Sequence, residues 1–534
     1  MREPDCRFAK EQFGSHFFTL NARDFVRIQQ LWSNSSMKSQ VSRPENQSKT
    51  TLISNRTAVV IGGSMAGLLA ARVLSQHFDQ VVVIERDQYP TRPEPRPNTP
   101  QANHVHVLLA RGLQSFEGFF PGLRKEMLAE GALEIETSAD IAWLNPAGWG
   151  VRFDSGVKAL SFSRGLLDWV VRRRLASFDN VHFLDNRVVT ELIADETGKR
   201  LIGVTFRQRQ NDGENDSGEE WLAADLIVDS AGRASKTPQW LAALGYQRPT
   251  ETVVNAHLGY SSRLYRIPQD FNADWKATFV QSAPPKHIRG GILFPIEGDR
   301  WLVTMVGGEK DYPPTDEEGF LSFAGSLRNS IIYDAIKNAE PLSPIFAHRG
   351  TENRRRHYEQ LKRMPEGLIV IGDGACAFNP VYGQGMTTAA LGAEWLHECL
   401  RKQFANEQHE ITGLGRKFQH GLAKLNASPW MLSTGEDYRY RKAEGGSPNL
   451  FNRFMHWFID QILQLTTYDI GVRQSFLSVQ GMLKSPTTLF APKIFLRVLG
   501  NARRNLFSRA EKKKTAKVET PSLAFRDKAS PSRF

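Results

Sequence analysis

Two short segments set an acidic or hydroxyl side chain among closely spaced glycines. The first segment, VVIGGSMAG, contains Gly62, Gly63, Ser64 and Gly67, and the second, GDGACAFNPVYGQGM, contains Asp373, Pro380, Gly383, Gly385 and Met386. Glycine weakens both helices and strands, so this density indicates that bare backbone must approach another group closely. Unpaired backbone N–H groups attract anions, and a carboxylate accepts hydrogen bonds from hydroxyl groups. Both segments are therefore candidate ligand-binding sites.

The elements around the first segment are those of a dinucleotide-binding turn. An apolar strand, TAVVIGG, precedes the turn, a helix of small residues follows it, and Glu85 ends the next strand, 18 residues after Gly67. In such a turn the glycines allow a tight bend, approach of the pyrophosphate and close helix packing, while the carboxylate accepts hydrogen bonds from the ribose. Ser64 replaces the second glycine of the pattern but keeps its backbone N–H. An ordinary tight turn between strand and helix is the alternative.

The second segment follows another buried strand, EGLIVIGDGA. Ligands of α/β sheets bind at the carboxyl ends of the strands, which is where Asp373 falls. Pro380 fixes a loop, and Gly383 and Gly385 open the helix QGMTTAALGAEWLHECL. The N-terminus of that helix suits an anion or a ring that becomes negative, such as a reduced flavin. A glycine-rich helix entry that serves packing alone is the alternative.

A third segment, DLIVDSAGRAS, also ends a buried strand, with Asp229, Gly232 and Ser235 in its turn. The three segments resemble the FAD-dependent monooxygenases of the p-hydroxybenzoate hydroxylase and squalene epoxidase fold, and within it the polyether-pathway flavin epoxidases of the lasalocid and monensin type. The segments PQANHVHVLLARG, SRGLLDW, LFPIEGDRWLVT and NRRRHYEQL carry the same likeness, which covers about residues 56–500. The resemblance implies an α/β fold, in which a Rossmann-like FAD-binding domain has an inserted antiparallel-sheet substrate domain and a C-terminal helical region.

The resemblance also implies roles for individual residues. The FAD pyrophosphate would be held by Gly62, Gly63, Ser64 and Gly67, and the adenosine ribose by Glu85. Arg164, at the start of a helix, would also contact FAD, and Asp373 would bind the ribitol. The isoalloxazine would be lined by Pro380, Gly383, Gly385 and Met386. For Arg164, a surface arginine at a helix start is the alternative. No metal is expected, because the spacing of the cysteines gives no metal pattern, and no catalytic side chain is assigned.

The implied activity is that of a monooxygenase of secondary metabolism. It would use FAD, NAD(P)H and O2 to epoxidise or hydroxylate a largely apolar polyene, polyketide or isoprenoid through a flavin C4a-hydroperoxide. Ala231 stands where the family's D-G-x-x-S element has an aspartate, so the choice of reductant stays open. The W-x-W-x-I-P element of halogenases is missing. Two other functions remain: an FAD-dependent reductase of isoprenoid double bonds, and a non-catalytic lipid-escort protein on a flavin fold.

The substrate region and two polar clusters are open to more than one interpretation. The residues Leu258, Tyr260, Phe279 and Phe294, with Trp430 from the helical region, form either a substrate wall or plain core. His104 and His106 alternate and would share one face of a strand, for a structural role or one beside the flavin or substrate. A metal would need further ligands. Arg354, Arg355 and Arg356 form either a strand over an acidic surface or a site for an NADPH phosphate.

Length and pattern divide the chain, since 534 residues are too many for one core. We predict a poorly ordered extension at 1–55, an FAD-binding domain in two parts at 56–245 and 346–400, an antiparallel-sheet substrate domain at 246–345, a helical region at 401–508 and a basic disordered tail at 509–534. Met37 is a second candidate for the start of translation, so the place of 1–36 in the native protein stays open.

Charge and cysteine use narrow the partners and the compartment. The net charge of +11 is concentrated at the end, where residues 501–534 hold ten lysines and arginines and three acidic residues. This tail is either solvated or attracted to anionic lipid, which would give peripheral membrane contact. A nucleic-acid partner is not expected, because the body has no basic stripe interleaved with aromatics. Three cysteines without a metal or disulfide pattern, and no apolar run of membrane-spanning length, predict a cytoplasmic protein.

Overall fold

The structure is a computed structural model that describes residues 56–209, 218–405, 410–508 and 521–525. The predicted extension at 1–55 lies outside these residues. A parallel five-stranded sheet runs in the order β20-β11-β1-β2-β7. Its strands are β1 (Thr57–Ile61), β2 (Gln80–Ile84), β7 (Val181–Leu184), β11 (Leu226–Asp229) and β20 (Leu368–Val370). Apolar residues fill β1, β2, β11 and β20, as a sheet covered on both faces requires, and the predicted α/β fold is confirmed.

The strand order brings the three glycine segments to one edge of this sheet. β11 pairs with β1 on one side and with β20 on the other. The register places Ile61 opposite Asp229, and Asp229 opposite Val370. Because all the strands are parallel, the turns that follow them lie side by side at the carboxyl edge, where ligands of such sheets bind.

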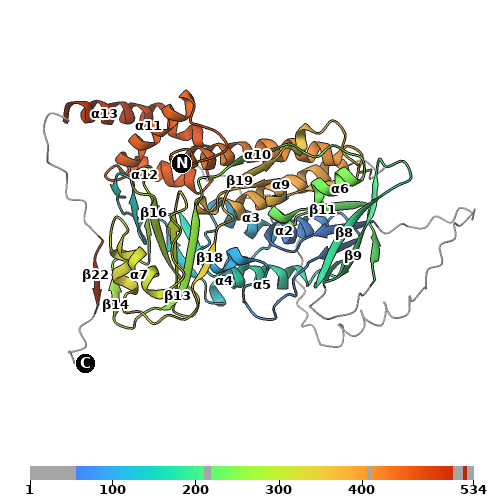
Figure 1. Ribbon diagram of the computed structural model, residues 1–534, viewed down its shortest axis with the longest axis horizontal. Helices are drawn as coiled ribbons and strands as arrows, with labels where there is room; N and C mark the ends of the chain where they lie inside the picture. Colours follow the sequence, from blue (N-terminus) through green and yellow to red (C-terminus); the bar gives the residue numbers. More distant parts are fainter. Residues whose placement is uncertain (1–55, 210–217, 406–409, 509–520, 526–534) are drawn as a thin grey trace, which may run out of the picture. The chain divides into compact units, whose positions relative to one another are not determined.

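Helices cover the sheet (Figure 1). The helices are α2 (Met65–Leu74), α3 (Ala110–Phe119), α4 (Leu123–Ala129), α5 (Arg164–Leu175), α6 (Thr237–Ala243), α9 (Gly385–Gln403) and α10 (Leu414–Asp437). α9 packs against α2, α3 and α10, and α5 packs against α2 and α4. The sequence between 105 and 131 reads as helical, and the structure divides it into α3 and α4 because Pro121 and the left-handed Gly122 (φ 82°) interrupt it.

A second, seven-stranded sheet has the order β18-β13-β17-β16-β15-β4-β5. Its strands are β4 (Ile141–Asn145), β5 (Gly148–Trp149), β13 (Gly259–Arg266), β15 (Ala277–Val280), β16 (Arg289–Ile296), β17 (Arg300–Gly307) and β18 (Phe346–His348). We predict this sheet within residues 246–345, but three of its strands, β4, β5 and β18, lie outside that range. β4 pairs in parallel with β15, a long-range pairing that the local pattern of a short strand cannot reveal.

The two faces of the seven-stranded sheet have different surroundings. On β17, Trp301, Val303 and Met305 pack into a core formed with α7 (Glu317–Gly325) and α8 (Ile331–Ile336). Thr304 and Val306 alternate with them and face a cavity instead. The sheet therefore presents one face to its own helices and the other to the cavity.

Smaller sheets and a helical region complete the fold. The smaller sheets contain β8 (Arg187–Ala194), β9 (Leu201–Gln208) and β10 (Glu220–Ala223); β12 (Glu251–Val254), β19 (Asn353–Arg356) and β21 (Cys376–Ala377); β3 (Leu133–Glu136) and β6 (Lys158–Ser161); and β14 (Phe271–Ala273) and β22 (Leu523–Phe525). The last pair places a strand inside the segment predicted to be a disordered tail, because antiparallel pairing orders it. On β19, Arg354 and Arg356 pair with Glu251, and Arg355 pairs with Glu359.

The helical region contains α11 (Leu450–Leu465), α12 (Ile470–Gln480) and α13 (Pro492–Ser508). These helices share a core that includes Phe458, Ile462, Val472 and Val498. Among the described residues, no helix is long and apolar enough to cross a membrane.

Gly67 is the position where close packing of α2 on the turn leaves no room for a side chain. A Cβ there would lie 1.9 Å from the carbonyl oxygen of Gly62. We expect Gly67→Ala to lower the free energy of unfolding by about 1–3 kcal/mol, because overpacking forces the backbone apart. Chemical denaturation measures this change.

The matched control for this substitution is Gly118→Ala in α3, where an added Cβ meets nothing within 4 Å. Alanine favours a helix over glycine by roughly 1 kcal/mol, so this variant should be no less stable than the parent chain. A Gly67→Ala protein as stable as the parent would contradict the packing described for the turn.

Candidate functional site

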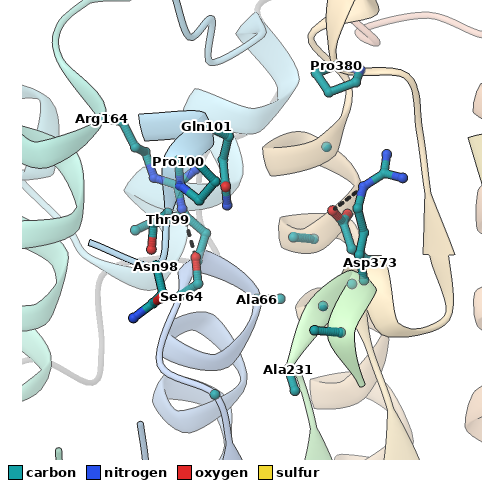
Figure 2. Close-up of a pocket in the computed structure, with 18 of the residues that line it drawn as sticks. Ser64, Ala66, Asn98, Thr99, Pro100, Gln101, Arg164, Ala231, Asp373 and Pro380 are labelled. Carbon is teal, nitrogen blue, oxygen red and sulfur yellow. Dashed lines mark hydrogen bonds and ion pairs between the residues drawn. The ribbon is translucent and has the colours of Figure 1, made fainter. Parts of the chain in front are cut away.

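A cavity of about 530 Å³ runs along the carboxyl edge of the parallel sheet and reaches the seven-stranded sheet. Figure 2 shows Ser64, Thr99 and Arg164 on one wall of the pocket and Asp373 and Pro380 on the other. The volume lies in the usual range of small-molecule sites. One cavity therefore joins the turns of the first sheet to the open face of the second.

Most of the predicted site residues line this cavity. They are Gly62, Ser64, Glu85, Arg164, Asp373, Pro380, Gly383, Gly385 and Met386. Gly63 and Gly67 do not line it and instead hold the turn. The Gly63 N–H donates to Oε2 of Glu85 at 2.7 Å, and Gly67 lets α2 pack onto Gly62. Gly62 itself adopts φ 95°, a left-handed conformation that glycine accepts without strain.

Three helices begin at the cavity, and each contributes its first residue to the wall: Met65 of α2, Arg164 of α5 and Gly385 of α9. The positive ends of three helix dipoles therefore converge on one space. Ser64, the residue before α2, makes no side-chain capping bond, so the first N–H groups of α2 stay available for a ligand. A Cβ added at Gly385 would meet nothing within 4 Å, so the start of α9 faces open space.

A buried ionic network fixes the wall next to the turn. Arg96 contacts Glu85 at 2.9 Å and Asp168 at 3.9 Å. Asp168 also accepts from Nε of Arg164 at 2.7 Å, and Arg164 donates to Oγ of Ser64 at 3.0 Å. Burial opposes the charge of Arg96, but Asp168 and Glu85 raise its pKa above the ordinary value. The network holds the Arg164 guanidinium at the start of α2, where an anion would bind.

Glu85 takes part in this network more fully than the sequence indicates. Its carboxylate accepts from Arg96 and from the N–H groups of Gly63 and Asp87, and the residue is 5% exposed. These bonds fix the turn itself. A contact between Glu85 and a ribose stays a prediction.

The segment 96–101 contributes lining residues that sequence reasoning missed. Arg96, Asn98, Thr99 and Gln101 come from the proline-rich loop after β2 and from the short 3₁₀ helix η1 (Pro100–Asn103). Asn98 donates to the buried carboxylate of Asp87, which anchors the loop. The sequence indicated a role in binding for this loop only by its position, shortly after β2 and Glu85.

Asp373 lies on the opposite wall, in the turn after β20. Its side chain is 45% exposed, because the carboxylate opens into the cavity. Arg233 lies 3.9 Å away and is anchored by hydrogen bonds to the carbonyl oxygens of Glu352 and Phe378. Although the side chain opens into the cavity, the protein that encloses the cavity displaces water and raises the pKa of Asp373, while Arg233 and Arg164 oppose that rise. The carboxylate is placed to accept hydrogen bonds from hydroxyl groups of a ligand.

A buried carboxylate on α10 holds the loop that leads into α9. Asp437 accepts from the hydroxyl of Tyr382 at 2.7 Å, from Nδ2 of Asn379 at 3.0 Å and from Nδ2 of Asn353 at 2.7 Å. Oδ1 of Asn379 in turn accepts from the hydroxyl of Tyr260 at 2.9 Å. One carboxylate therefore connects the loop around Pro380 to α10, to β19 and to the seven-stranded sheet.

The sheet end of the cavity is lined by aromatic, aliphatic and histidine side chains. Tyr260, Ile292, Thr304, Val306 and His348 come from the seven-stranded sheet, and His104 and His106 from the segment after η1. Burial lowers the pKa of both His104 and His106 to about 3, so both rings are neutral at physiological pH. Of the residues proposed for a substrate wall, Tyr260 lines the cavity, whereas Leu258, Phe279, Phe294 and Trp430 do not.

The comparisons with known proteins define the class. No protein-family model matches the chain. The solved structure of the flavin-dependent brominase Bmp2 superposes with a TM-score of 0.58 at 15% identity and covers 84% of this chain and 99% of Bmp2. Kynurenine 3-monooxygenase of Salinispora tropica is 26% identical over 363 residues, 64% of this chain and 72% of the relative. The fold and these relatives place the chain among the FAD-dependent oxidoreductases with the monooxygenase fold.

A nearer relative is Protein Rv3254 of Mycobacterium tuberculosis, which is 33% identical over 432 residues, 80% of this chain and 90% of the relative. The chain belongs to the family of Protein Rv3254. The predicted fold and oxidoreductase class are thus confirmed, while the finer likeness to polyether-pathway epoxidases stays a prediction.

Asp437 gives the site a testable pH dependence. Burial raises its pKa to about 7, although Tyr382 and Asn379 oppose the rise. The folded chain therefore binds this proton more tightly than the unfolded chain. Its contribution to stability is complete below the ordinary aspartate pKa and is lost as the pH rises through about 7, at about 1.4 kcal/mol per pH unit.

We expect Asp437→Asn, which cannot titrate, to remove this slope from the free energy of unfolding measured between about pH 5 and about pH 7. The control is Asp334→Asn, a half-buried carboxylate whose pKa is lowered by Lys337 and so lies below that range. This control should keep the slope of the parent chain. An unchanged slope in Asp437→Asn would show that another group titrates.

Proposed function

We propose that the chain is an FAD-dependent monooxygenase that uses NAD(P)H and O2 to epoxidise or hydroxylate a largely apolar small molecule. The observation that carries the proposal is the continuity of the cavity. Glycine turns and helix N-termini line one end, and the open face of the antiparallel sheet lines the other. A cofactor and a substrate would thus share one enclosed space.

The residues present fit an extended FAD. The available N–H groups of α2 with Ser64 and Arg164 would hold the pyrophosphate, and Asp373 the ribitol hydroxyls. Gly383, Gly385 and Met386 at the open start of α9 would face the isoalloxazine. Bound FAD would supply the redox chemistry, taking a hydride from NAD(P)H and passing one oxygen atom of O2 to the substrate.

The chain's own side chains would position the substrate and exclude water. Ile292, Val306 and Val381 give the sheet end an apolar wall. Phenol hydroxylation benefits from a side chain that takes the phenolic proton, and a histidine with a pKa of about 3 is a poor base. Epoxidation of an alkene needs no such base. Neutral histidines are therefore compatible with epoxidation, which is the reaction that the product analysis below tests first.

The proposal is tested by product analysis under labelled dioxygen. FAD-loaded protein is supplied with NADPH and a panel of neutral polyenes, and the products are examined for the oxygen label. We expect flavin to copurify, O2 to be consumed, and one labelled oxygen atom to enter the product. A product reduced at a double bond without label would indicate an isoprenoid reductase. Protein that takes up no FAD would indicate an escort function.

We also propose peripheral contact with an anionic membrane through the C-terminal helices. The exposed apolar residues there are Leu450, Phe451, Phe454 and Trp457 on α11 and Leu496 and Leu499 on α13. The exposed side chains of Arg453 and Lys493 lie on the same helices, and the basic segment 509–534 follows them. Apolar side chains flanked by cations suit an interface with acidic headgroups.

Vesicle flotation tests this contact. We expect the protein to float with vesicles that contain phosphatidylserine, less with phosphatidylcholine alone, and less at high salt. Phe451→Glu with Leu496→Glu should reduce the floating fraction, whereas Trp221→Glu, a 63% exposed aromatic on β10, should not. Equal flotation with both lipids would contradict the proposal.

A further inference from the structure

His104 places an unpaired polar atom at the sheet end of the cavity. The residue is 5% exposed, and its ring lies 5.9 Å from that of Tyr260 and 5.7 Å from that of His348. Nδ1 contacts Oγ of Ser262 at 2.7 Å, but Nε2 is buried without a hydrogen-bond partner among the described residues. A buried polar group without a partner is costly, so a ligand that pairs with Nε2 gains affinity.

A chain of hydroxyl groups determines which ring nitrogen carries the proton. The N–H of Val105 donates to Oγ1 of Thr304 at 3.0 Å, so the Thr304 hydroxyl must place its own proton elsewhere. Oγ of Ser262 lies 2.6 Å away and can accept it. Ser262 then donates to Nδ1 of His104, and the ring proton sits on Nε2. The reverse direction would leave the Thr304 hydroxyl without an acceptor among the described residues.

The charge around His104 limits what it can bind. Burial, together with His348 and His106, lowers its pKa to about 3, so the ring is a neutral donor. Tyr260, His348 and His106 are the titratable groups that face it, and burial raises the pKa of Tyr260 and lowers those of the two histidines, so all are neutral as well. Arg233 already donates to two carbonyl oxygens. It is also paired with Glu352 at 3.1 Å. Among the described residues that line this end of the cavity, a carboxylate therefore finds no cation without a partner.

We propose that Nε2–H of His104 donates a hydrogen bond to an uncharged oxygen atom of the substrate. The substrate class is then a neutral, largely apolar molecule that carries a carbonyl, ether or hydroxyl oxygen close to the carbon atoms that react. The inference rests on the proposed function, because FAD is taken to fill the cavity between Ser64 and Met386. His104 lies with Tyr260 and His348 on the sheet side, so the substrate rather than the flavin is its partner.

The protonation state is read by ¹⁵N NMR of histidine-labelled protein, with His104→Phe identifying the signal. We expect a neutral Nε2–H tautomer from about pH 5 to about pH 8, with and without FAD. In Ser262→Ala, the loss of the Nδ1 donor should mix the two tautomers. A Nδ1–H tautomer in the parent chain would overturn the proposal. The tautomer is also measured without FAD. A protein that fails to bind FAD would therefore contradict the proposed function, while the tautomer of His104 could still be determined.

Binding is tested on FAD-loaded protein with 2-undecanone, n-undecane and undecanoate as probes. We expect 2-undecanone to shift the Nε2–H signal and to bind more tightly than the other two. His104→Phe should weaken binding of the ketone by about 5- to 30-fold and leave the alkane unchanged, as the loss of one buried hydrogen bond implies. His348→Phe, a matched change in the neighbouring ring, should keep the preference for the ketone. A signal that shifts with FAD but not with the ketone would assign the donor to the flavin and overturn the proposal.

Discussion

The parallel pairing of β11 with β1 and with β20 is the constraint on which the site depends. The three strands are separated widely in the sequence, yet their register sets Ile61, Asp229 and Val370 in one row. Each strand ends in a turn that carries glycine, and the turns form one edge. The same register therefore sets the distance between Asp373 and the start of α2, which line one cavity.

Buried polar groups then hold the loops of that edge in place. Arg96 joins Glu85 to Asp168 on one wall, and Asp437 collects three donors beneath the opposite loop. Removing one partner of such a network leaves a buried charge or donor unpaired, which costs several kcal/mol. Contacts within the chain itself thus hold both walls in place, as preorganisation of a site for an extended cofactor requires.

The sequence predicted the turns well and the networks poorly. Gly62, Ser64 and Asp373 could be found because glycine and carboxylate after a buried strand are local signals. The partnership of Arg96 with Asp168 could not, because a proline-rich loop meets a distant helix only in the folded chain. Asp437 gave no signal at all, since one acidic residue near the end of a helix usually faces solvent.

The seven-stranded sheet also has features that depend on contacts between distant parts of the chain and that the sequence alone does not predict. The alternation in β17 was visible, but the side that faces the cavity depends on where α7 and α8 pack. Phe279 and Phe294 lie on the same face of the sheet as Ile292, which lines the cavity, yet neither lines it, because the cavity covers only part of that face. Tyr260 lies within the covered part. The pairing of β4 with β15 could not be predicted either, because the two strands are far apart in the sequence and a local hydrophobic pattern does not reveal which strands pair.

A crystal structure of the chain with FAD tests the account most directly. We expect density for the pyrophosphate between Arg164 and the first turn of α2, for the ribitol beside Asp373, and for the isoalloxazine at the start of α9. The substrate space would remain between that ring and His104. FAD bound elsewhere, or an isoalloxazine directed away from α9, would contradict it.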